Sequence, residues 1–265
     1  KGLLTISDEG DKEHFELYPL RPDFGAIDPK AKVRVYAGDF GRPYHFVPSP
    51  CGKWIAFSNH RNELCLLNLE TEELVKVDQN IYGMIDSYDW SPDSRWLAYS
   101  INDTRLTRRI IIYGLENAER HVITKAVKYD DEPCFDPEGK YLYFISCRDY
   151  EPVFDSVQFG CAFIKDSKPY LITLKKDSRS PFCPEPKALE DKAKPEKDKD
   201  KKQDQDKPKV KPVEIDFDGI EQRIVEFPVG NAGMGGLAAT AGKIFYYKYD
   251  AFKIPKEGNN LAVDL

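Results

Sequence analysis

Few residues of this sequence have types and spacings that suit chemistry, and the first candidate is a pair of neighbouring arginines. Arg108 and Arg109 directly precede the apolar run Ile110-Ile111-Ile112. Two guanidinium groups side by side could form a fork that binds a carboxylate through paired hydrogen bonds. The alternative is a pair of strand-edge residues that holds no ligand, and we favour it. Both arginines remain the candidates for substrate binding.

The motifs of common catalytic centres do not occur in the sequence. There is no Gly-x-Ser-x-Gly turn, no His-Glu-x-x-His zinc motif, no Walker loop and no Gly-x-Gly-x-x-Gly after a strand. The histidines have no serine and acid partners at a recognised spacing, so we interpret each as a loop or strand-edge residue: His14, His45, His60 and His121. The sequence therefore predicts no catalytic residue, no metal site and no cofactor in this chain.

Composition narrows the class of protein. The net charge of −6 lacks the basic excess of nucleic-acid-binding proteins. No apolar run approaches the roughly 18 residues of a membrane span. Six cysteines occur without a close Cys-x-x-Cys pair, so we interpret them as reduced, packed side chains, which is typical of cytoplasmic proteins. The chain begins without Met, and we expect it to be a piece of a longer protein.

A repeat indicates which elements hold these residues in place. The segments "SPCGKWIAFS", "WSPDSRWLAYS" and "FDPEGKYLYFIS" share one pattern. Their prolines Pro50, Pro92 and Pro137 are 42 and 45 residues apart, and Trp54, Trp96 and Tyr141 follow at the same steps. A period of about 40–50 residues is typical of a supersecondary unit that is used again, as in β-propellers.

Each repeat predicts a tight turn followed by a buried strand. Proline presets φ at the second turn position, and the preceding Ser or Asp can bond to the backbone. The next four residues are continuously apolar, which indicates a strand covered on both faces. Four short strands per unit predict an all-β fold of antiparallel blades, a β-propeller. A β-sandwich, the alternative, does not predict a fixed period.

The repeat count predicts about five blades in a partial, open ring. A propeller closes its ring to bury its sheet edges, so we expect further blades outside this chain. The approximate blade boundaries are 1–38, 40–79, 82–124, 127–229 and 236–265.

A lysine-rich stretch interrupts the fourth unit. Residues 187–211 contain 10 lysines and 7 acidic residues with almost no apolar side chains, so they are predicted to be disordered. An interaction tail or a domain linker is the alternative. We favour a solvated insertion within one blade, because "KPYLITLKK" before it and "QRIVEFPV" after it both resemble strands of that blade.

Four segments of the sequence together resemble the tricorn protease family: "SPDSRWLAYS", "FDPEGKYLYFISCRDYEPVFDSVQF", "KPYLITLKKDSRSPFCPEP" and "PVEIDFDGIEQRIVEFPV". The resemblance implies a part of the second, seven-bladed propeller of such a protein. Tricorn-type proteins also carry another propeller, a PDZ-like domain and a C-terminal serine-peptidase core. None of the family's catalytic residues matches a position here. The chain departs from the pattern at Cys51, where aspartate is usual.

Two classes of function remain open on this basis. In the first, the propeller guides or filters peptides toward a serine-peptidase core in the same polypeptide. In the second, it is a TolB-like or scaffolding propeller that binds protein partners and has no enzymatic core. For the first class, the expected partners are peptide substrates, the remaining blades and core of the parent chain, and a further copy in a homo-oligomer. Nucleic acid and membrane are not expected partners.

Overall fold

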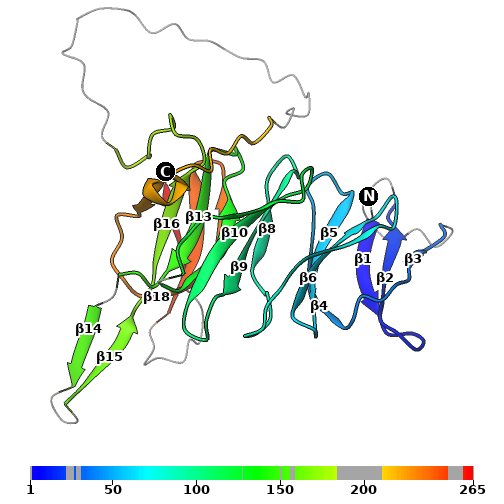
Figure 1. Cartoon of the computed structure of the whole chain (residues 1–265), viewed down its shortest axis with the longest axis horizontal. Coiled ribbons are helices and arrows are strands. Elements are labelled where there is room, and N and C mark those ends of the chain that lie inside the picture. The colour runs from blue at the N-terminus through cyan, green and yellow to red at the C-terminus, as the bar shows by residue number, and fades with distance from the viewer. Residues whose placement is uncertain are drawn as a thin grey trace, which may run out of the picture.

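The computed structural model describes residues 2–21, 27, 31–126, 128–149, 151–155, 159–183, 211–249 and 259–264. In this part of the chain, antiparallel sheets stand side by side in a row, from the N-terminal sheet at one end to the β18 sheet at the other (Figure 1). The row does not close on itself. This arrangement confirms the predicted all-β fold, an open array of propeller blades.

The strands of each sheet follow one another in sequence. The first sheet contains β1 (Gly2–Ser7), β2 (His14–Pro19) and β3 (Arg34–Tyr36). The second contains β4 (Pro43–Pro48), β5 (Trp54–Asn59), β6 (Glu63–Asn68) and β7 (Leu74–Gln79). The third contains β8 (Tyr88–Trp90), β9 (Trp96–Asn102), β10 (Arg108–Gly114) and β11 (Arg120–Val122).

The last two sheets contain the longer connections. The fourth consists of β12 (Asp130–Phe135), β13 (Tyr141–Ser146), β16 (Lys168–Thr173) and β17 (Ile224–Glu226). A separate hairpin, β14 (Glu151–Asp155) with β15 (Gly160–Lys165), follows β13 in the sequence and projects away from the sheets (Figure 1). A short 3-10 helix, η1 (Ile220–Arg223), precedes β17. The fifth sheet consists of β18 (Gly233–Thr240), β19 (Lys243–Tyr249) and β20 (Asn259–Asp264).

The repeated turns have one geometry. Gly52, Ser94 and Gly139 adopt left-handed φ angles of 71°, 62° and 70°. In each turn the amide of that residue donates to the carbonyl of the residue three positions earlier, at 2.8 Å. Ser94 adopts this unfavourable conformation although it is not glycine, and its hydroxyl accepts the amide of Cys51 at 3.0 Å. The serine thus joins the turns of two neighbouring sheets.

Both faces of the central strands are buried, as the apolar runs predicted. Along β9, Leu97 and Tyr99 pack in the cluster shared with the second sheet, and Ala98 packs in the cluster shared with the fourth. All three side chains are fully buried. The core therefore consists of layers between successive sheets. Trp54, Trp96 and Tyr141 begin the second strand of three consecutive sheets, so they occupy the equivalent places predicted from their spacing.

A segment of the fourth unit crosses onto the third sheet. We call residues 211–219 the strap. Its Val213 amide donates to Asp93 Oδ2 at 2.7 Å, and its Val213 carbonyl accepts Trp96 Nε1 at 3.1 Å. Phe217 packs on the Trp96 ring with centroids 5.4 Å apart. The strap therefore connects two neighbouring sheets through residues more than a hundred positions apart in sequence.

The lysine-rich stretch lies outside the described residues from 187 to 210, so its predicted disorder stays a prediction. The strands on either side of it pair in one sheet, with Leu171 opposite Val225 and Ile172 opposite Ile224.

Candidate functional site

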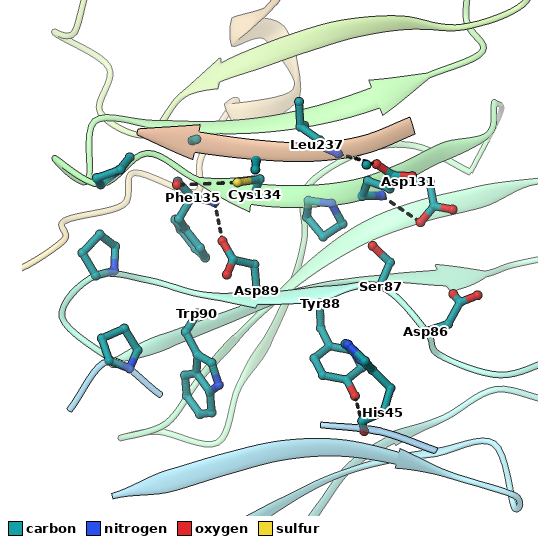
Figure 2. A pocket seen from close by; sticks show the side chains of 18 residues that line it. His45, Asp86, Ser87, Tyr88, Asp89, Trp90, Asp131, Cys134, Phe135 and Leu237 are labelled. Carbon is teal, nitrogen blue, oxygen red and sulfur yellow. Dashed lines mark hydrogen bonds between the residues drawn. The ribbon is translucent and has the colours of Figure 1, made fainter. Parts of the chain in front are cut away.

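The first strands of the second to fifth sheets, β4, β8, β12 and β18, line a groove of about 850 Å³. Each of these strands is an edge strand of its sheet, and β12 packs against both β8 and β18. Figure 2 shows the lining side chains converging from β8, β12 and β18, with β4 at one side. The three repeated turn prolines, Pro50, Pro92 and Pro137, all line this groove. The repeated turns therefore contribute to the lining of the groove. We call the four first strands β4, β8, β12 and β18 the inner strands, and their unpaired edges the inner edges.

Two aromatic side chains of β8 reach across to β4. Tyr88 Oη donates to the carbonyl of His45 at 2.7 Å (Figure 2). Trp90 Nε1 donates to the carbonyl of Val47 at 3.0 Å. Both side chains are buried, and both carbonyls belong to the edge strand β4. The bonds therefore satisfy backbone acceptors on an edge that has no neighbouring strand.

Two carboxylates bond to backbone amides of the next inner strands, β12 and β18. Asp89 Oδ2 accepts the amide of Phe135 on β12 at 2.7 Å (Figure 2). Glu132 Oε2 accepts the amide of Leu237 on β18 at 2.8 Å. Burial raises the pKa of Asp89 to about 6 and raises the pKa of Glu132, although the backbone amides oppose both shifts. Among the described residues, neither carboxylate has an ion-pair partner.

These four contacts determine how the groove can treat a peptide. A free strand edge ordinarily offers amides and carbonyls to which an extended peptide can add as a further strand. Here a side chain of a neighbouring sheet occupies a carbonyl or an amide on three of the four edges, those of β4, β12 and β18. A peptide could pair with those groups only by displacing the side chains. The groove is therefore better suited to contact through side chains than to strand addition.

The predicted arginine pair does not converge on one site. Arg108 is buried behind the groove wall, where its guanidinium bonds to Asp131 and Asp86, two residues that line the groove. Arg109 lines a different hollow of about 540 Å³ and pairs with Asp103 at 3.1 Å. Neighbouring residues of a strand point to opposite faces, which is why the two guanidinium groups diverge. Their role toward substrate stays a prediction.

The residues that shape the groove were not identified from the sequence. Tyr88, Asp89 and Glu132 lie on inner strands, and their importance depends on which strands become neighbours in space. One signal was present: Asp89 is an acidic residue between two aromatic ones in a buried strand, where a charge is costly without a partner.

Other chemistry is sparse in the described part of the chain. No group of three or more His, Cys, Asp or Glu side chains there could hold a metal ion. All six cysteines, each in a described position, are free. Within the same residues, no helix is long and apolar enough to cross a membrane.

Comparison with known proteins identifies the family. Residues 2–261 match the family model described as the tricorn protease second beta propeller domain. The chain belongs to the tricorn protease family. The resemblance predicted from the segments 91–100, 135–159, 168–186 and 212–229 is thereby confirmed. The tricorn protease homolog 1 of Streptomyces coelicolor is 31% identical over 90% of this chain and 22% of its own length.

Further relatives agree with the assignment. The putative tricorn-like protease C-terminal subunit of Sulfurisphaera tokodaii is 35% identical over 72% of this tricorn propeller chain and 20% of its own length. The crystal structure of the tricorn protease superposes with a TM-score of 0.79 at 21% identity, covering 98% of this chain and 24% of that one. The chain thus spans about a fifth to a quarter of these proteins. TolB from Acinetobacter baumannii, at a TM-score of 0.54 and 11% identity, shares the propeller fold.

Proposed function

We propose that this chain is a non-catalytic propeller part of a tricorn-type serine peptidase. In this proposal the propeller guides or filters peptide substrates toward a peptidase core that lies outside residues 1–265, and the parent protein works in the cytoplasm. The named proteases among the relatives support a peptidase parent. A TolB-like ring that binds protein partners without a peptidase core is the alternative, and only the shared fold supports it.

The observation that carries the proposal is the occupied inner edge of the sheets. A surface that guides a peptide must hold it weakly enough for the peptide to move on. Addition of the peptide as a β-strand would supply a row of backbone hydrogen bonds and would slow its release. Because Tyr88, Trp90, Asp89 and Glu132 occupy edge groups of the inner strands, this mode is disfavoured along the groove. The repeated prolines add wall surface without amide donors.

Obstruction of the groove tests the proposal. Ala238 is exposed on β18 and lines the groove, so Ala238→Trp in the full-length protein adds bulk there. We expect kcat/KM for a long unstructured peptide to fall on the order of tenfold, a cost of about 1.4 kcal/mol in transition-state free energy. Cleavage of a short chromogenic substrate should remain unchanged.

The matched control places the same bulk elsewhere. Thr71 is exposed in the turn between β6 and β7, the two outer strands of the second sheet. Thr71→Trp should leave both substrates unaffected. Equal cleavage of long peptides by wild type and Ala238→Trp would contradict a route along this groove.

A further inference from the structure

We propose that the groove selects peptides by charge, favouring those with a free amino terminus, lysine or arginine over acidic peptides. This inference rests on the proposed function, since it names the class of peptide that would use the same groove. It goes further because it assigns the selection to fixed acidic side chains of the inner strands.

The lining of the groove has one sign of charge. Four carboxylates contribute to it, and no lysine or arginine does: Asp86, Asp89, Asp131 and Glu132. His45 is the one basic residue that lines it, at the β4 side. All four line the one groove: Asp86 precedes β8, Asp89 lies on β8, and Asp131 and Glu132 lie on β12.

The protein compensates only part of this charge. Arg108 neutralises one charge of the pair Asp86 and Asp131 from behind the wall. Asp89 and Glu132 are bonded to backbone amides, which orient them but carry no full charge. Counting His45 as neutral, the described lining with Arg108 therefore carries a formal charge of −3, from four carboxylates and one guanidinium. A cleft with low-dielectric walls focuses such a field and concentrates ligands of opposite charge.

The geometry of the edges makes charge the main means of selection. Because side chains occupy edge groups of β4, β12 and β18, recognition of a passing peptide through regular backbone pairing is disfavoured. The prolines at the end of the groove toward the turns offer apolar contact only, whereas Asp86 lies at the other end with a side chain 53% exposed. A cationic group arriving at that end would meet Asp86 and then the carboxylates further in.

The test uses isosteric neutral variants of the full-length protein. Asp89→Asn together with Glu132→Gln removes two charges, yet each new amide oxygen can still accept the amide of Phe135 or Leu237. The probes are two peptides with the same sequence around the cleaved bond, one with a lysine-rich tail and one with a glutamate-rich tail. We expect wild type to prefer the lysine-tailed peptide in kcat/KM. In the double variant this preference should fall on the order of tenfold.

A control and a second measurement keep the inference testable if the double variant folds poorly. Glu116→Gln with Asp218→Asn removes the same net charge from exposed positions, 74% and 95% accessible, and should leave the preference unchanged. In wild type, raising the salt concentration should reduce the preference toward unity, since ions screen exposed charge. An unchanged preference in the neutral double variant, or a wild-type preference that salt does not affect, would overturn the inference.

The two proposals fail in different ways. If Ala238→Trp slows only long peptides but both tails are cleaved equally well, the groove is the route and charge selection is wrong. If Ala238→Trp has no effect on either tail, the route itself is wrong.

Discussion

Replacement of Arg108 by alanine should destabilise the propeller by about 2–4 kcal/mol, because removal of one partner leaves buried carboxylate charge uncompensated. The Arg108 side chain is 5% exposed and its guanidinium bonds to both Asp131 and Asp86. Asp131 is mostly buried and also accepts the hydroxyl of Ser100 at 2.6 Å. The half-exposed Asp86 can recover hydration, which keeps the expected loss below the upper range for a fully buried pair.

Arg109 provides the matched control for this loss. It is the next residue on β10, yet its side chain is 33% exposed and it pairs with a similarly exposed Asp103. We expect Arg109→Ala to cost less than about 1 kcal/mol, as is typical of surface ion pairs. Native-state hydrogen exchange of the β9 and β10 amides in the full-length protein would measure both changes. Equal losses for the two variants would show that the Arg108 network does not hold the third and fourth sheets.

The second large effect is expected at Trp96. Trp96→Ala should lower the free energy of unfolding by about 3–5 kcal/mol, the range for loss of a large aromatic side chain from a core. Trp96 packs against the cluster shared by the third and fourth sheets, and its indole donates to the carbonyl of Val213 in the strap. Its removal also takes away the ring on which Phe217 packs.

Trp54 separates the role of the strap from that of the aromatic ring. It begins β5 as Trp96 begins β9, and it is half-buried against the cluster shared by the second and third sheets. Trp54→Ala should therefore cost about 1 kcal/mol less than Trp96→Ala, the typical worth of a hydrogen bond. Hydrogen exchange in β5 and β9 would compare the two losses. A larger loss for Trp54→Ala would contradict a stabilising strap.

The blade pattern was predictable because each repeat contains its signals within a short stretch of sequence. A proline turn, an aromatic residue and a continuous apolar run occur within about a dozen residues, and their period is visible along the chain. Trp54, Trp96 and Tyr141 consequently fell at equivalent places. Burial of both faces of β9 followed from the same run.

The groove was harder to predict because it forms between repeats. Asp89 and Phe135 are 46 residues apart, and Glu132 and Leu237 are 105 apart. Their contact depends on the packing of successive inner strands, and insertions of different length hide the spacing. The strap is a similar case, since Trp96 and Val213 lie 117 positions apart and the lysine-rich stretch lies between them. The arginine pair shows the converse: Arg108 and Arg109 are neighbours in sequence but serve opposite faces of one strand.

The most direct test of the account is photo-crosslinking of a bound peptide in the full-length protein. A photoreactive phenylalanine analogue would replace Ser87, which lines the groove, or Val122, which lies on the outermost strand β11 of the same sheet and is 53% exposed. With the proposed peptidase core inactivated by a serine-directed reagent, we predict that a labelled long peptide crosslinks at position 87 and not at 122. Unlabelled peptide should compete for the crosslink. Crosslinking at position 122 alone, or equally at both positions, would contradict the proposal that peptides follow this groove.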